Sequence, residues 1–466
     1  MAALATPVKA ASPPAGTWSS VVGAMTKTGG ASLASGLLSL LATKILAVEL
    51  GPSHMALFAT LQQVRQTAVT AGTLTGQTAL VQGTSSTEGR ARREFLRTAA
   101  CLMLAASAIV CGVLLAAPAW AAERSGLPAE QARLAGWVVL AVLPAVVFVF
   151  LAALLNAFGA IGALAWVQLA APAAMALLAY PVARNVAHGN TSAFVLLLAG
   201  TSLAAIVAAG FALRSYGAAL RTCFHGEGSW LHLPAARKFF AISGSMFASG
   251  LFSSWAVLTV RARILNTQGL HAGGEFDAAW AVSMNQAGLV LASLQTYYLP
   301  LLARTSDPRE RSVQIARVLT VASLSGAVLI VILILGKSTV LSLLYSPAFA
   351  GGERYLRWTL VGDYLKIASW IFSIPLLAAG NMRAFLAADL SAYAGFLIVS
   401  SGLARWFTAA EAASIGFVAL YAVHLIFCGS YLWSRGEFRP RPRTAVVWLG
   451  GLALIAATSV AFWSPA

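Results

Sequence analysis

Charge is scarce in this chain, and acidic charge is the scarcest. Only 10% of the 466 residues are Asp, Glu, Lys or Arg, whereas soluble domains contain about 25%. Hydrophobic residues make up 59% of the chain, which is more apolar surface than a folded sphere of this size can bury. Because the apolar excess runs almost from end to end, it excludes a disordered chain, a collagen, a disulfide-rich secreted protein and a soluble enzyme with one anchor. The chain is expected to fold in lipid.

Motifs for metal binding, nucleotide binding and covalent chemistry are also missing. The six histidines form no HxxxH or HExxH pattern, so no metal site is predicted. The segment Gly336-Lys337-Ser338-Thr339 resembles the end of a P-loop, but Val331 occupies the place of the first glycine. No predicted loop is long enough for a catalytic domain, and we expect no enzyme activity. The four cysteines form no CxxC pair and are interpreted as packing residues: Cys101, Cys111, Cys223 and Cys428.

The charge that is present is strongly basic, with 31 Lys and Arg against 15 Asp and Glu and a net charge of +16. Nucleic-acid binding would require a basic face with interleaved aromatic residues on a soluble domain. No stretch of the sequence has that character, so no nucleic-acid partner is predicted. The meaning of the basic charge therefore depends on where the basic residues lie in the chain.

Apolar runs of about 20 residues, the length that crosses a membrane, predict thirteen helices. The first six are 21–47, 54–83, 95–117, 134–157, 161–183 and 193–217. The second six are 238–265, 277–303, 314–336, 354–380, 384–404 and 411–434, and 444–463 would be the thirteenth. Residues 1–17 are predicted to form a flexible cytoplasmic tail, and no cleavable signal peptide is expected.

The basic residues orient these helices. With the N-terminus in the cytoplasm, seventeen Lys and Arg fall in inside loops and five in outside loops. Cytoplasmic loops of membrane proteins carry the excess of Lys and Arg. The distribution therefore predicts a cytoplasmic N-terminus, and a thirteenth helix would place the C-terminus outside.

Two halves of the chain show a similar pattern, because polar, Arg-rich loops at 84–97 and 305–317 each precede an apolar span. The predicted fold is an all-α polytopic membrane protein with two six-helix lobes and an extra C-terminal helix. A pseudo-two-fold axis along the membrane normal would relate the lobes, an arrangement that usually places a substrate path between them. The predicted parts are an N-lobe at 18–217, a cytoplasmic linker at 218–237, a C-lobe at 238–434, and a basic loop with the thirteenth helix at 435–466.

A few basic residues remain inside the predicted spans, where charge is expensive and is by default a functional hypothesis. Arg65 and Lys366 lie near the middle of the bilayer. Arg261 and Arg263 lie toward the outer end of the seventh helix and point in nearly opposite directions. Headgroup contact and substrate contact are equally consistent with Arg261, whereas headgroup contact is favoured for Arg263.

Two aspartates are candidates for ion coupling. Asp363 and Lys366 share a helix face at i,i+3. They either form a structural ion pair, or Asp363 binds a proton or a sodium ion that Lys366 helps to release. Asp389 is either a solvated helix end or a second coupling residue.

The second predicted helix is too polar to face lipid. Gln62, Gln63, Arg65 and Gln66, with several threonines after them, cover more than one face. We expect this helix to line a water-filled cavity. Basic groups in such a cavity favour an anion, and phosphate above all, whereas an exporter of cationic drugs would favour buried acids and aromatics.

Several segments of the chain form a recognisable set. They are Leu360-Val361-Gly362-Asp363-Tyr364-Leu365-Lys366 after Trp358, Tyr298-Leu299-Pro300 with Arg304, Gly51-Pro52, Arg261, Asn381-Met382-Arg383-Ala384-Phe385 and Asp389-Leu390-Ser391. In these segments the chain resembles the Wzx-type lipid-linked oligosaccharide flippases, and most closely the branch that transports lipid III of the enterobacterial common antigen. The resemblance covers about residues 30–435 and departs from the family in two places. The position of the family's arginine in the second helix carries Gln62, with Arg65 one turn later, and the thirteenth helix exceeds the usual twelve.

The resemblance implies membership of the multidrug/oligosaccharidyl-lipid/polysaccharide superfamily in the bacterial inner membrane. The implied activity moves an undecaprenyl-pyrophosphate-linked oligosaccharide from the cytoplasmic to the periplasmic leaflet by alternating access. Such transport serves surface polysaccharide biosynthesis (lipopolysaccharide, O-antigen or exopolysaccharide), with polysaccharide polymerase and chain-length proteins as neighbours. No cofactor is expected, although a proton or sodium gradient would couple the transport.

In this interpretation Arg65, Arg261 and Lys366 hold the pyrophosphate or its adjacent sugar, and Gln62, Gln63 and Gln66 admit the glycan. Asp363 and Asp389 are the coupling candidates. Two alternatives stay open: a multidrug exporter of the same fold, and a non-transporting membrane component of the polysaccharide machinery.

Overall fold

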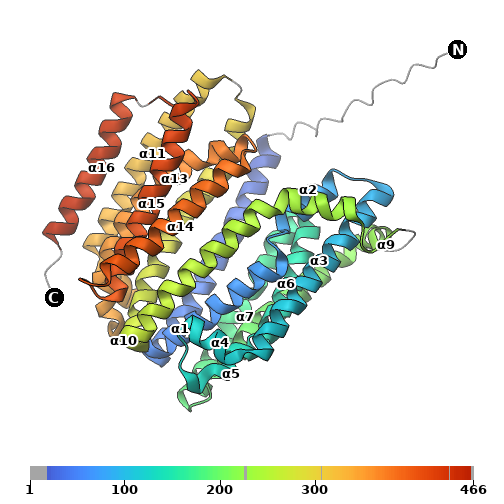
Figure 1. Cartoon of the computed structure of the whole chain (residues 1–466), viewed down its shortest axis with the longest axis horizontal. Coiled ribbons are helices and arrows are strands. Elements are labelled where there is room, and N and C mark those ends of the chain that lie inside the picture. The colour runs from blue at the N-terminus through green and yellow to red at the C-terminus, as the bar shows by residue number, and fades with distance from the viewer. Residues whose placement is uncertain (1–17, 225–227, 306, 440, 463–466) are drawn as a thin grey trace.

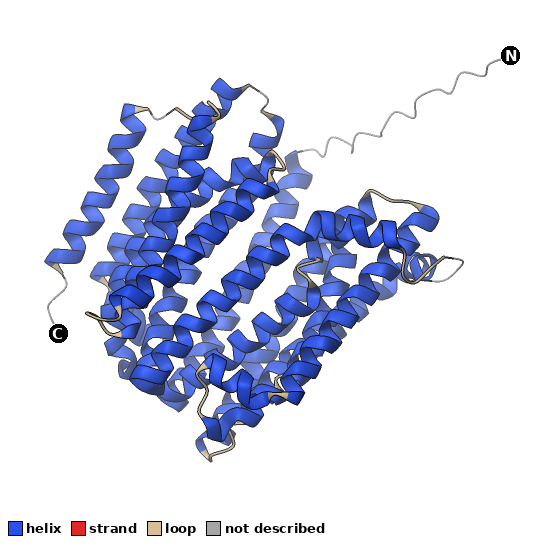
Figure 2. Ribbon diagram, in the orientation of Figure 1, coloured by secondary structure: helices blue, strands red, loops and turns tan. Residues whose placement is uncertain are grey.

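The computed structural model describes residues 18–224, 228–305, 307–439 and 441–462. Within these ranges all regular secondary structure is helical, and turns and short loops connect the helices (Figure 2). The all-α prediction is therefore confirmed, and the predicted tail at 1–17 lies outside the described residues.

In the first half of the chain, the described residues form nine α-helices. They are α1 (Trp18–Thr73), α2 (Gln77–Ser85), α3 (Gly89–Ala116), α4 (Pro118–Ser125), α5 (Ala132–Trp137), α6 (Val139–Ala157), α7 (Ile161–Ala187), α8 (Ala193–Leu213) and α9 (Gly217–Phe224). The second half contains α10 (Leu233–Arg304), α11 (Pro308–Leu335), α12 (Lys337–Leu344), α13 (Glu353–Ala378), α14 (Met382–Leu403), α15 (Ala409–Ser434) and α16 (Pro442–Ala461). Short 3-10 turns at Ala129–Gln131, Arg214–Tyr216 and Pro347–Gly352 connect some of them.

Two of the helices, α1 and α10, each contain two predicted spans. The expected loops at 48–53 and 266–276 are wrong, because a single non-helical residue replaces each of them. Gly51 has φ 67° and ψ −176°, and Gly269 has φ 80° and ψ 178°. This backbone region is essentially restricted to glycine, so one residue redirects the chain without a loop.

Smaller differences concern helix ends. The predicted helix 54–83 is interrupted after Thr73, where Leu74 and Thr75 have positive φ, and it resumes as α2. The predicted linker 218–237 is partly helical, because it contains most of α9 and the first turn of α10. The composition of these two segments is typical of a linker, but many of their residues form short helices.

Eleven helical segments of the described chain are long and apolar enough to cross a membrane. Two of them, Leu33–Ser85 and Leu233–Gln286, have 53 and 54 residues, more than twice the length of about 20 residues that one crossing needs. Each includes one of the two glycine breaks. The chain is a multi-pass membrane protein, and its last span, Pro442–Ala461, corresponds to the predicted thirteenth helix.

Helix lengths repeat between the two halves. The helices α3 and α11 each have 28 residues, and α4 and α12, which follow them after one residue, each have 8. This agreement supports the internal repeat expected from the Arg-rich loops. The pseudo-two-fold axis itself stays a prediction.

The long helix α10 crosses the molecule diagonally, with α2–α7 on one side and α11 and α13–α16 on the other (Figure 1). Among the described residues, every extensive contact between α1–α9 and α10–α16 involves α1 or α10. Any relative motion of the two groups must therefore change the contacts that α1 and α10 make.

The two groups meet closely where α1 and α10 turn. A Cβ atom on Gly274 would lie 2.0 Å from the backbone oxygen of Pro52, so the two backbones touch without an intervening side chain. Lys44 of α1 donates to the carbonyl oxygen of Ser342 in α12 at 2.8 Å. In the predicted orientation this closed end faces outward.

Candidate substrate and coupling sites

Arg65 lies inside the first half of the molecule. Its Nη1 donates to the Ser202 hydroxyl of α8 at 2.9 Å, and its buried Nε has no hydrogen-bond partner. Arg65 and Gln62, one turn earlier, line a cavity of about 150 Å³ together with Ser39, Phe58 and residues of α7 and α8. Among the described residues no carboxylate lies within ion-pair distance of this guanidinium, which leaves donors available for an anion.

The other polar residues predicted on this helix do not join Arg65. Gln66 is exposed, Gln63 is partly buried, and neither lines the cavity. Thr67 faces a different and larger pocket between α1, α3 and α10. The sequence predicts that these polar residues line one water-filled cavity. In the structure they are instead distributed over two faces of α1.

Lys366 and Asp363 are buried in α13, but they do not form the ion pair that their spacing allowed. The Lys366 ammonium lies 3.2 Å from the sulfur of Met284 and 5.5 and 5.9 Å from the ring centroids of Tyr421 and Phe417. Such ring contacts stabilise a cation but do not neutralise it. Within the described part of the chain, this ammonium has no carboxylate at ion-pair distance.

Asp363 is completely buried and has a partner on another helix. The Gln286 side chain of α10 donates to its Oδ2 at 2.8 Å, and among the side chains that the structure describes its Oδ1 has no hydrogen-bond partner. A buried carboxylate with one unsatisfied oxygen can accept a proton or a further hydrogen bond. The site is thus compatible with the predicted coupling role.

Asp389 lies at the meeting point of three helices. The Ser249 hydroxyl of α10 donates to its Oδ2 at 2.5 Å, and Nε2 of His424 in α15 lies 3.4 Å from its Oδ1. The His424 side chain is only 4% exposed, and among the described residues its Nδ1 has no hydrogen-bond partner. Protein groups therefore engage both carboxylate oxygens, and one of these groups is an imidazole.

Arg261 has a partner that the sequence interpretation missed. Its Nη2 lies 2.5 Å from Oδ2 of Asp277, and both side chains are about 10% exposed. The two residues stand eight positions before and after Gly269, so the pair joins the two arms of α10 across its turn. Arg263 is exposed, and its headgroup contact stays a prediction.

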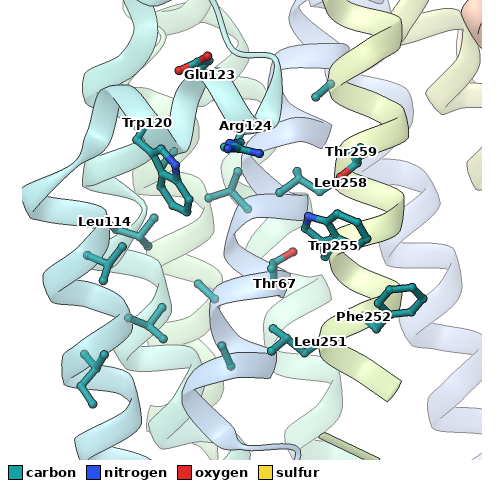
Figure 3. A pocket seen from close by; sticks show the side chains of 18 of the residues that line it. Thr67, Leu114, Trp120, Glu123, Arg124, Leu251, Phe252, Trp255, Leu258 and Thr259 are labelled. Carbon is teal, nitrogen blue, oxygen red and sulfur yellow. The ribbon is translucent and has the colours of Figure 1, made fainter. Parts of the chain in front are cut away.

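A pocket of about 920 Å³ lies between α1, α3, α4 and α10 (Figure 3). Its walls are mainly apolar, including Val113 of α3 and Leu251 and Trp255 of α10. Charged residues lie at one end: Glu123 and Arg124 on α4 and Arg263 on α10. No predicted substrate residue lines this pocket.

Sequence reasoning missed His424, Asp277 and Ser249. The sequence contained a signal for two of them, because an ionisable residue within an apolar span is itself a functional hypothesis. His424 was considered only as a member of metal-binding patterns, and Asp277 was placed at a helix end. No such signal marks Ser249, because serines are common in membrane helices.

Known proteins resemble this chain in part of its sequence and in its fold. No family model matches the chain. Lipid III flippases from Escherichia coli K12 and from Shigella flexneri are each 24% identical to it over 167 residues, 35% of this chain and 39% of the relative. The aligned part therefore spans well under half the length of these curated relatives.

Solved structures share the fold over nearly the whole chain. The lipid II flippase MurJ in its inward closed conformation superimposes with a TM-score of 0.70 at 14% identity, covering 94% of this chain and 93% of MurJ. An inward-facing MATE-family multidrug transporter of the MOP superfamily gives 0.63 at 16% identity, covering 91% and 95%. The chain has the fold of these transporters.

Proposed function

We propose that the protein translocates an undecaprenyl-pyrophosphate-linked oligosaccharide from the cytoplasmic to the periplasmic leaflet. The observation that carries this proposal is a pair of cations within the spans, the partly buried Arg65 and the buried Lys366, with no carboxylate at ion-pair distance among the described residues. Buried charge is normally paired. A pyrophosphate passing between the two halves would supply the missing negative charge.

The relatives support the substrate class. Lipid III flippases match part of the chain, and the lipid II flippase MurJ shares its fold. We place the protein in the bacterial inner membrane with a cytoplasmic N-terminus, acting in biosynthesis of a surface polysaccharide such as O-antigen or exopolysaccharide. Polysaccharide polymerase and chain-length proteins would act on its product.

The substrate contacts divide between the two halves. Arg65 and Gln62 would hold phosphate or the first sugar on one side, and Lys366 on the other, while Gln63 and Gln66 would admit the glycan. Arg261 can take part only when its pair with Asp277 opens.

For coupling we favour a proton over a sodium ion. His424 and Ser249 already engage both oxygens of Asp389, and proton transfer between imidazole and carboxylate requires no further ligands. Asp363, with its unsatisfied oxygen, is the second coupling candidate.

Loss of the protein tests this function. Deletion should cause lipid-linked repeat units to accumulate on the cytoplasmic face, and expression of Arg65→Ala or Lys366→Ala variants should fail to restore surface glycan at normal membrane levels. Arg184→Ala, which removes an exposed arginine of α7, is the matched control. Normal glycan in both variants would contradict the proposal, and unpolymerised units on the outer face would indicate a role in polymerisation instead.

The fold supports one alternative function, multidrug export, because a MATE-family multidrug transporter superimposes on most of the chain. Export predicts that a deletion strain becomes drug-sensitive while its surface polysaccharide remains normal. The buried acids that would attract cationic drugs are mostly occupied here, Asp277 by Arg261 and Asp389 by His424 and Ser249.

A further inference from the structure

The pocket of about 920 Å³ has the shape of a groove that runs along α10. Lining residues on this helix extend from Ala248 to Asn266, about 27 Å at 1.5 Å per residue. The hydrocarbon core of a bilayer is about 30 Å thick. The groove therefore follows α10 through most of the apolar depth of the membrane.

The groove is open to its surroundings along its apolar length. Ile109 and Val113 of α3 are 68% and 46% exposed, and Leu251 and Trp255 of α10 are 37% and 48% exposed. In a chain that crosses the membrane, such side chains face lipid. A hydrocarbon chain can enter this groove sideways from the bilayer, whereas the cavity beside Arg65 holds about 150 Å³.

Charge is confined to one end of the groove. Figure 3 shows Glu123 and Arg124 above Trp120 and Trp255, with Leu251 and Phe252 farther along the apolar wall. Arg124 and Arg263 carry exposed guanidinium groups, and among the described residues neither has a carboxylate at ion-pair distance. With one carboxylate, Glu123, the rim remains net positive.

An apolar trough with a basic rim fits an amphiphile with an anionic head. Guanidinium groups bind phosphate through paired hydrogen bonds, and tryptophans are typical of the membrane interface at which a headgroup lies. In the predicted orientation this rim faces the periplasm. A lipid bound here would therefore have its head in the outer leaflet, as the substrate does after translocation.

We propose that this groove binds the polyprenyl chain of the translocated substrate, with its phosphates at Arg124 and Arg263. This inference rests on the proposed function and assigns the groove to the stage before release. It differs from the proposed contacts at Arg65 and Lys366, since no residue of those sites lines the groove.

Photo-crosslinking tests the apolar part of the groove. A benzophenone side chain at position 251 or 113 of the full protein, in vesicles of phosphatidylethanolamine and phosphatidylglycerol, is expected to label radioactive undecaprenyl pyrophosphate. The control position is Leu177 of α7, which is 79% exposed and lies outside the groove. Two results would support the proposal: labelling about tenfold above this control, and displacement of the label by unlabelled undecaprenyl pyrophosphate. The tenfold ratio is the one expected for a site that favours the lipid by a factor of ten.

Equal labelling at Leu251 and Leu177, or equal displacement by phosphatidylglycerol, would overturn it and identify the groove as a site for ordinary bilayer lipid. The rim is tested with Arg124→Ala/Arg263→Ala, which should reduce labelling at position 251 about tenfold, as expected for loss of charge-assisted hydrogen bonds. The matched control is Arg133→Ala/Arg184→Ala. Unchanged labelling in the rim variant would overturn the phosphate assignment.

A parallel assay separates this inference from the proposed function. Translocation of a fluorescent lipid-linked oligosaccharide by the unsubstituted protein in the same vesicles reports the function alone. Translocation without labelling of the groove would overturn only the groove proposal, whereas absence of translocation would contradict the proposed function itself.

Discussion

Two sets of charged side chains within the spans have different surroundings: the aspartates of the second half, and the cations Arg65 and Lys366. All four aspartates of the chain lie in the second half. Three of them, in α10, α13 and α14, are paired or hydrogen-bonded: Asp277 with Arg261, Asp363 with Gln286, and Asp389 with Ser249 and His424. Among the described residues, Arg65 and Lys366 have only neutral partners, the hydroxyl of Ser202 for one and Met284 with two aromatic rings for the other.

This difference separates the two tasks that a coupled transporter must perform. A cation with neutral partners is suited to attract an anionic substrate, and carboxylates beside an imidazole are suited to exchange protons. The helix α10 connects the two regions, because Ser249 contacts Asp389 while its neighbours Ala248 and Leu251 line the groove on the other half. We therefore expect substitutions of the aspartates to affect coupling, and substitutions of Arg65 or Lys366 to affect substrate binding.

The largest effect is expected from opening the Arg261–Asp277 pair. Arg261→Ala should destabilise the protein by about 3 kcal/mol, because removing one partner leaves a buried charge uncompensated. Thermal unfolding in detergent measures this loss. The double variant Arg261→Met/Asp277→Leu should recover most of it, whereas a stable Arg261→Ala protein that no longer binds substrate would assign this arginine to the substrate instead.

The next effect concerns Asp389. Asp389→Asn should lower proton-driven translocation in vesicles about a hundredfold, equivalent to about 2.7 kcal/mol, because it removes the negative charge that His424 faces. Binding of the lipid-linked oligosaccharide should remain, since Arg65 and Lys366 are unchanged. If Asp389→Asn abolished binding and left coupling intact, the division of roles between the aspartates and the two cations would be wrong.

Arg65 provides the complementary test in the first half. Arg65→Ala should weaken binding of undecaprenyl pyrophosphate about tenfold, as expected for the loss of one charge-assisted contact. Coupling to the proton gradient should survive at saturating substrate. Arg65→Lys keeps the charge, and its affinity for undecaprenyl pyrophosphate should lie between those of Arg65→Ala and the unsubstituted protein. Calorimetry measures these affinities. Tight binding to Arg65→Ala would remove this site from the proposal.

The sequence predicted the helical spans well because each span needs only a long apolar run, which composition reveals. It failed at the turns of α1 and α10. There Gly51 and Gly269 redirect the chain through backbone conformation alone, with no change in composition around them. A polar stretch such as 266–276 has the same composition in a loop and in a helix that continues beyond the membrane. Composition therefore does not distinguish the two.

The same limit applies to the candidate sites. Hydropathy identified Arg65, Lys366 and Asp363 as charges within spans, and all three are at least partly buried. It could not identify their partners, because Ser202 is 137 residues from Arg65 and Gln286 is 77 residues from Asp363. Such pairs depend on how helices pack, and the sequence around each residue does not encode that packing. The functional roles of these residues remain predictions.

The smallest expected effect distinguishes neighbouring glutamines on α1. Gln62 lines the cavity with Arg65, whereas Gln66 is exposed and lies outside it. Gln62→Ala should therefore reduce affinity for undecaprenyl pyrophosphate by about 0.5–1.5 kcal/mol, the net value of one hydrogen bond, and Gln66→Ala should leave it unchanged. Calorimetry on both variants measures the difference. Equal losses would mean that α1 presents both faces to the substrate, so that the first half binds through a broad wet surface and not through the enclosed site around Arg65.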